Sequence, residues 1–191
     1  MDQKLDKWIR WLTVIRDDVQ QLVMHKDIFW QVGDIVNSNP KIQLHNAFYD
    51  FINNSHAAYV TMAIRRQTKT HKDSISFLGL LEDIAANPEI LSRKYYRGLY
   101  KETVVEDLAD EHFDQFAAPG GEHVDPDLVR LDINRLGKAW NKVEDLADRR
   151  IAHRDKKKVA SLPTFNDVDA CIDLLDELYC RYNLALNAVA Q

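Results

Sequence analysis

Three side chains in the C-terminal third of the chain have the types and the spacing needed for proton transfer next to an anion. Asp145, Arg149 and His153 follow one another at intervals of four residues. In a helix they share one face, and the Cβ atoms of Arg149 and His153 lie roughly 6 Å apart. A histidine with an ordinary pKa of about 6.5 can accept or return a proton, and a guanidinium can bind negative charge. The same residues can equally form an exposed ion pair beside a solvated imidazole.

The segment that carries this histidine is a basic spot on an acidic chain. The whole chain has a net charge of −5, whereas residues 149–158 contain six basic residues and one acid. The basic residues are Arg149, Arg150, Arg154, Lys156, Lys157 and Lys158. The negative net charge argues against a protein that binds nucleic acid or membranes over its whole surface. Any contact with an anionic partner is therefore expected at this one segment.

The run from Arg149 to Asp155, followed by Pro163-Thr164-Phe165 and a long amphipathic helix, resembles the HEPN superfamily, in particular its AbiU-type abortive-infection branch. The specific part of the resemblance spans residues 130–190, and the earlier helices are similar in order and spacing. The resemblance implies an α-helical bundle that pairs with itself and brings an arginine and a histidine of each copy to a shared cleft. In active members this cleft cuts RNA without metal.

The family motif is an arginine, four to six other residues, and a histidine. His153 matches the histidine, in the Ala-His context that the family favours, but the arginine position falls on Asp148, Ala147 or Leu146. We therefore expect His153 to act as the acid or base, with Arg149 as the phosphate-binding substitute. The expected RNA-backbone contacts are Arg150, Arg154, Lys156 and Lys157.

Two functions from different classes stay open. The first is a metal-independent endoribonuclease of bacterial defence or toxin–antitoxin systems, in which two copies supply one base and one acid. The second is a HEPN module without catalysis that dimerises and binds a partner, and Asp148 favours it. Some family members are silenced by a nucleotidyltransferase that modifies a tyrosine two residues after the histidine, where this chain has Asp155. The partners that the resemblance implies are a second copy of the chain, RNA and a protein antitoxin. No cofactor and no metal are expected.

Composition predicts an all-α fold. The 191 residues are 46% hydrophobic and 29% charged, and six glycines and five prolines are too few for many short strands. We expect one HEPN-like domain over residues 1–191, an up-and-down bundle of about five to seven helices that forms a homodimer. The charged N-terminus and the lack of an apolar stretch long enough for a membrane predict a cytoplasmic protein. Cys171 and Cys180 lie nine residues apart in one predicted helix, too far for a disulfide, and we expect them to be buried.

Capping residues and apolar periodicity predict where the helices lie. Asn39-Pro40, Asn87-Pro88 and Asp125-Pro126 predict helix starts near 40, 88 and 126. Asp73 or Ser74 is the expected cap of another helix, and Thr164 of the last. Apolar side chains recur at steps of three and four over residues 5–23, 44–63, 131–151 and 168–189.

Other polar clusters favour structural roles. Arg93 and Arg97 alternate with tyrosines in a way that suits base stacking, but the tyrosines share a face and favour packing at the edge of the core. His56 falls on an apolar helix, where a hydrogen-bonded packing role is expected. His112 and His123 lie among acids, but their spacing matches no metal site.

Overall fold

The computed structural model describes residues 3–44, 46–146 and 163–188, and every regular element there is a helix. The α-helices are α1 (Gln3–Ser38), α2 (Ala47–Thr68), α3 (Phe77–Ala86), α4 (Arg93–Tyr100), α5 (Ala109–Phe113), α6 (Pro126–Leu146) and α7 (Phe165–Asn187), with short 3₁₀ turns at Pro88–Ile90 and Glu106–Leu108. The predicted all-α bundle is confirmed. No helix in the described part of the chain is long and apolar enough to cross a membrane.

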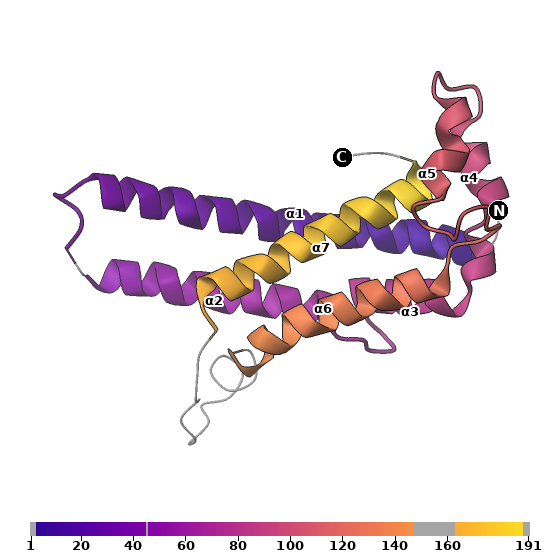
Figure 1. Ribbon diagram of the computed structural model, residues 1–191. Coiled ribbons are helices and arrows are strands. Elements are labelled where there is room, and N and C mark those ends of the chain that lie inside the picture. Colours follow the sequence, from indigo (N-terminus) through magenta and orange to yellow (C-terminus); the bar gives the residue numbers. More distant parts are fainter. Residues whose placement is uncertain (1–2, 45, 147–162, 189–191) are drawn as a thin grey trace.

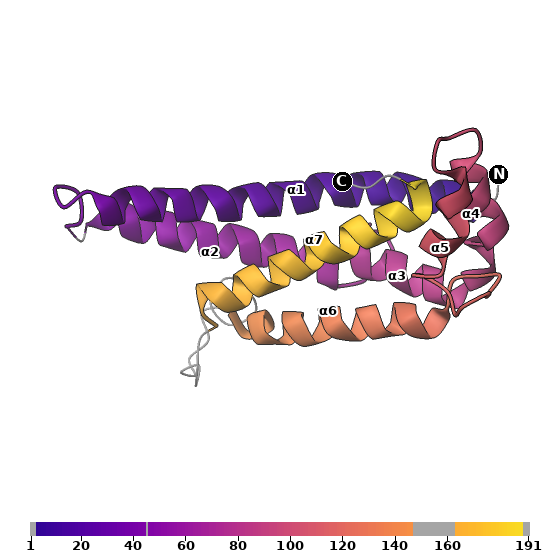
Figure 2. The ribbon, with the colours of Figure 1, turned by 45° about the horizontal axis from the view of Figure 1, so that its top comes forward.

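The long helices form the body of the molecule and the short ones close one end. Helices α1 and α2 make an antiparallel hairpin, and α7 runs diagonally along it (Figure 1). Figure 2 shows α7 between α1 and α6, and α6 also packs on α3. Helices α4 and α5 lie at the end where α1 begins. The loop end of the α1–α2 hairpin therefore extends beyond the part that α6 and α7 cover.

The core follows the apolar spacing of the first and last helices. In α1 the buried residues are Leu5, Trp8, Leu12, Ile15, Val19 and Leu22, and in α7 they run from Val168 to Leu186. Cys171 is buried, Cys180 is half-buried, and both are free thiols. Burial raises the pKa of the Cys171 thiol to about 12, so it packs as an apolar side chain.

Three predicted helix starts were wrong. Asn39-Pro40 lies in the turn after α1, and α2 begins at Ala47, where the Asn46 side chain accepts from the N–H groups of Phe48 and Tyr49. Pro88 opens only a 3₁₀ turn, and α3 is capped by Ser76 rather than by Asp73 or Ser74. The physical reason is that several polar residues precede each helix, and tertiary packing decides which of them becomes the cap. The starts at Pro126 and after Thr164 are confirmed.

Helix α2 buries a different face from the one expected. Its buried residues begin at His56 and include Val60, Ala63 and Ile64. Phe48 and Phe51, which belong to the apolar spacing of residues 44–63, are 61% and 64% exposed. Leu131 of α6 is likewise exposed. The correction has a simple cause, because α6 and α7 reach only the second half of α2 and leave its first half with no helix to cover its outer side.

Candidate functional site

The predicted catalytic and RNA-binding residues lie outside the described residues. His153, Arg149, Arg150, Arg154, Lys156 and Lys157 all belong to residues 147–162, between α6 and α7. Asp145 belongs to the last turn of α6. Their assignments therefore stay predictions, and the structure describes the two helices that hold the ends of this segment.

Helix α7 starts at a fixed point, because Thr164 and Asp167 form a capping box. The Thr164 hydroxyl accepts from the Asp167 N–H at 3.3 Å, and the Asp167 carboxylate accepts from the Thr164 N–H at 2.9 Å. These hydrogen bonds from Thr164 hold the pKa of Asp167 below its usual range. Both groups satisfy backbone N–H donors that the first turn of a helix leaves free, so the chain enters α7 at a defined residue.

Replacing Thr164 by alanine is expected to destabilise the protein by about 1 kcal/mol, because an N-cap hydroxyl contributes about that much. The free energy of unfolding, measured by urea denaturation of the full chain, checks this. Thr164→Ser keeps a hydroxyl that can accept from the Asp167 N–H, so it should retain most of the stability. Equal losses in both variants would contradict the role of the cap.

Helix α6 ends against α2. Lys69, the C-cap residue of α2, forms an ion pair with Glu144 in the last turn of α6. The Lys69 ammonium also lies 5.8 Å from the centroid of the Trp140 ring, whose residue is 3% exposed. The exposed ion pair contributes little energy on its own.

The start of α7 packs against an aromatic cluster that contains a buried histidine. The His56 ring stacks on Phe29 with 3.9 Å between centroids and lies 5.7 Å from the ring of Phe165. His56 is 8% exposed, and its Nε2 has no hydrogen-bond partner among the described residues. The expected packing role is correct, but within the described part of the chain Nε2 takes no part in the hydrogen bonding that was expected. Spacing alone gave no sign of the Phe29 and Phe165 contacts, which come from two other helices.

Burial, with a smaller contribution from nearby His25, lowers the pKa of His56 to about 4. An imidazole in the unfolded chain titrates at about 6.5, so the neutral ring favours folding above that pH, and this stabilisation is lost as the pH falls from about 6.5 through about 4. We expect a loss on the order of 2–3 kcal/mol from this group. Urea unfolding between pH 7 and pH 4 should show that His56→Leu has a smaller pH dependence than the native chain. An identical pH dependence in both proteins would contradict it.

The arginine–tyrosine cluster of α4 is structural. Arg93 is 5% exposed and pairs with Asp110 and Asp114, while its Nε donates to the Gly121 carbonyl at 2.9 Å. Arg97 makes two hydrogen bonds to Asp110. Tyr96 and Tyr100 are buried in the core. Both guanidinium groups are thus paired with carboxylates, as the packing interpretation expected.

The histidines near the acidic loop form no metal centre within the described ranges, where no group of three or more potential ligands comes together. The Nδ1 atom of His112 lies 2.8 Å from the Tyr100 hydroxyl. This contact joins α4 to α5, and within α4 the Tyr100 hydroxyl also shares a hydrogen bond with the Tyr96 hydroxyl.

The fold and the sequence together define the class of protein. It is a helical bundle in which a basic segment that contains a histidine connects the last two helices. The family model for AbiU2, a HEPN family, matches residues 5–190. The chain therefore belongs to the AbiU2 family of HEPN proteins. Neither the curated proteins nor the solved structures gave a significant match. The family membership supports a role in abortive infection, a form of defence.

Proposed function

We propose that this protein is a metal-independent endoribonuclease that acts through His153 and Arg149 at a cleft shared by two copies of the chain. The observation that carries the proposal is the family match over residues 5–190, a range that contains the Ala152-His153 pair which the sequence assigns to the motif. The net +5 charge of residues 149–158 adds an electrostatic attraction for RNA.

The proposed step is transesterification within the RNA chain. The imidazole of one His153 takes the proton of a ribose 2′-hydroxyl, the 2′ oxygen forms a bond to the adjacent phosphorus, and the bond from phosphorus to the 5′ oxygen breaks. A second imidazole, protonated and supplied by the other copy, gives a proton to the leaving 5′ oxygen. Arg149 binds the extra negative charge of the phosphate in the transition state. The products are a 2′,3′-cyclic phosphate and a 5′-hydroxyl, and no electrons change hands.

The ends of α6 and α7 support this placement. Glu144 in the last turn of α6 pairs with Lys69 of the α2 C-cap, and Phe165 in the first turn of α7 lies beside His56 of α2. The chain thus leaves α6 and enters α7 against the same helix.

The test is an incubation of the purified full chain with single-stranded RNA in EDTA. We expect cleavage of the RNA and no cleavage of DNA of the same sequence, because DNA lacks the attacking hydroxyl. Intact RNA, or cleavage only after a divalent metal is added, would overturn the proposal.

One sequence feature favours a second function. Asp148 stands where the shortest form of the motif has its arginine, and a carboxylate there would repel phosphate. A HEPN module that dimerises and binds a protein partner without catalysis follows from that residue. The RNA incubation separates the two functions, since the second predicts a dimer with no cleavage.

A further inference from the structure

A groove lies between α1 and α7, which run antiparallel. Trp30 of α1 donates to Asp169 at 2.7 Å, and Lys26, one turn earlier, pairs with Asp173, one turn later. The groove beside these contacts has a volume of about 510 Å³, within the roughly 300–1,000 Å³ of typical binding clefts. We call it the α1–α7 groove, and its lining includes Val23, Met24, Asp27, Ile28, Asp176 and Cys180.

The α1 side of the α1–α7 groove offers apolar surface. Met24 and Ile28 are 44% and 50% exposed, and they lie four residues apart on one face of the helix. The lining runs from Gln20 to Gln31, which is about 16 Å along α1, or three helical turns. An apolar strip of this length on a helical surface suits the apolar face of another helix laid along it.

Carboxylates from both helices give the groove a negative charge. Asp27 comes from α1 and Asp176 from α7, and no lysine or arginine is among the described residues that line the groove. Burial and repulsion from Asp173 raise the pKa of Asp176. Burial and the Asp176 carboxylate also raise the pKa of the Cys180 thiol. A cation placed beside Asp176 would relieve this repulsion.

One lysine lies among the carboxylates of this region. Burial disfavours the charge of Lys26, yet Asp173, Asp169 and Asp27 hold its pKa above the ordinary value. Lys26 also acts on Asp176, whose charge it favours. Four carboxylates against this one ammonium leave a formal charge of −3. The region is therefore an acidic surface around an apolar strip.

The cations that come next along α1 and α7 have acidic partners of their own. Arg16 pairs with Asp17 at 3.1 Å, and Arg181 pairs with Asp132 at 3.6 Å. They do not compensate the charge at the groove. A ligand that complements the groove therefore carries positive charge beside apolar side chains.

We propose that the α1–α7 groove binds a basic amphipathic helix of a protein partner. The helix lays apolar side chains against Met24 and Ile28 and places lysines or arginines beside Asp27 and Asp176. The proposal goes beyond the RNA site and does not depend on cleavage of RNA.

Charge disfavours two other occupants of the groove. The phosphates of RNA would be repelled by the carboxylates. A second copy that docked through the same groove in a twofold contact would bring Asp27 and Asp176 of both copies together, again with repulsion. A basic protein is the occupant that the groove complements.

The probes are two synthetic peptides of about 15 residues, enough to span the three turns of the groove. Both carry leucine at every third or fourth position. One has lysine on both sides of the leucine stripe, and the other has glutamate at the same positions. We expect the lysine peptide to bind the full chain at least about 10-fold more tightly, because like charges repel across an interface. Calorimetry measures the two affinities. Equal affinities, or no binding of the lysine peptide, would overturn the proposal.

A charge-matched pair of variants locates the acidic part of the site. Asp27→Lys should weaken binding of the lysine peptide about 10-fold, because it replaces an attraction by a repulsion. Glu111→Lys makes the same change in net charge at an exposed position of α5 and should leave the affinity unchanged. Equal effects of the two substitutions would mean that only the overall charge attracts the peptide, which overturns the proposal.

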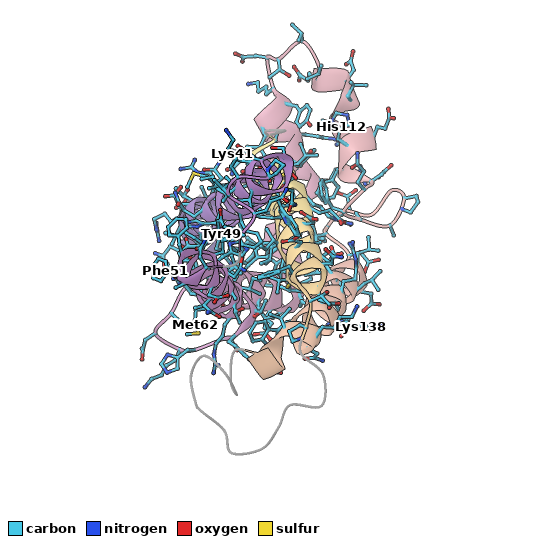
Figure 3. The ribbon with its side chains drawn as sticks, turned by 90° about the vertical axis from the view of Figure 1, so that its left-hand side faces the viewer. Lys41, Tyr49, Phe51, Met62, His112 and Lys138 are labelled. Atoms are coloured by element: carbon cyan, nitrogen blue, oxygen red, sulfur yellow. The ribbon has the colours of Figure 1, made fainter. Side chains whose placement is uncertain are left out.

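A second pair locates the apolar part. Ile28→Gln should weaken binding of the lysine peptide about 5-fold, because the peptide loses apolar contact with a half-exposed isoleucine. The control is Met62→Gln, since Met62 is 43% exposed and Figure 3 places it on the side of the α1–α2 hairpin opposite to α7. It should bind as the native chain does. A loss at Met62 as large as that at Ile28 contradicts the assignment to the groove.

The thiol of Cys180 provides a footprint of the bound helix. Cys180 lines the groove and is half-buried, whereas Cys171, the other cysteine of the chain, is buried. A thiol reagent should therefore label Cys180 first. The lysine peptide at about ten times its Kd should slow this labelling about 10-fold. Labelling that the peptide does not slow overturns the proposal. Slow labelling of the native chain alone that Ile28→Gln accelerates assigns the groove to a second copy and also overturns it.

Discussion

His153→Ala is expected to lower the rate of RNA cleavage at least about 100-fold, since a positioned general acid or base contributes about 10²–10⁴-fold. In a site shared by two copies the substitution removes the base from one side and the acid from the other. We therefore expect the loss of rate to lie nearer about 10⁴-fold than about 10²-fold. The rate of cleavage of single-stranded RNA in EDTA, at equal concentrations of dimer, measures the effect.

The matched control for this variant is His71→Ala. His71 has a side chain that is 68% exposed, in the connection between α2 and α3. It should cut RNA at the native rate. Native activity in His153→Ala would refute the assignment of His153, and a comparable loss in His71→Ala would show that the assay reports a general effect of removing an imidazole.

Trp8→Ala is expected to have the largest effect on stability, with a loss of about 3–5 kcal/mol, because it removes a fully buried indole and leaves a cavity. Trp8 is 0% exposed, and its Nε1 donates to Asp83 at 3.0 Å. Asp83 also accepts from Lys7 at 2.7 Å. Burial disfavours the charge of Asp83, yet the bonds from Lys7 and Trp8 hold its pKa below the usual range. Urea unfolding of the full chain measures the loss.

Trp30→Ala is the control that separates burial from hydrogen bonding. The Trp30 indole also donates to a carboxylate, that of Asp169 at 2.7 Å, but the residue is 42% exposed. We expect a loss of about 1 kcal/mol, the typical value for a point substitution. Similar losses in both variants would mean that the aspartate contact, rather than the buried area, accounts for the stability at Trp8.

The sequence alone predicted the fold class and the two helices with the clearest periodicity. The buried residues of α1 (Leu5, Trp8, Leu12, Ile15, Val19 and Leu22) and those of α7 from Val168 onward follow the spacing of three and four residues. In both helices one apolar face meets one core, so spacing is enough. Thr164 was also predictable, because a hydroxyl three residues before an acid can satisfy two N–H groups by local geometry alone.

Helix α2 shows where such prediction stops. Spacing identifies Phe48, Phe51 and Met62 as apolar positions on one face, but an apolar face that stays exposed has the same pattern as one that meets the core. The partners of Arg93 were equally out of reach. Asp110 and Asp114 lie 17 and 21 residues further along the chain, and only the fold brings them to the guanidinium.

The candidate site was predicted by other means than apolar spacing. The resemblance supplied the role of His153, and helical spacing supplied Arg149 in place of the missing motif arginine. The structure adds the two helices that bracket this segment and the aromatic cluster at the start of α7. The ring contacts of Phe165 could not be predicted from spacing, because its neighbours Phe29 and His56 belong to α1 and α2.

The chemistry of the cut RNA ends tests the central claim most directly. The full chain is incubated in EDTA with an RNA in which each ribose in turn carries a 2′-deoxy substitution, and the products are identified by mass. We predict 2′,3′-cyclic phosphate and 5′-hydroxyl ends, with no cut after a 2′-deoxy residue, because the 2′ oxygen is the attacking atom. Intact RNA, or products that carry a 5′-phosphate, would contradict a nuclease that works through His153.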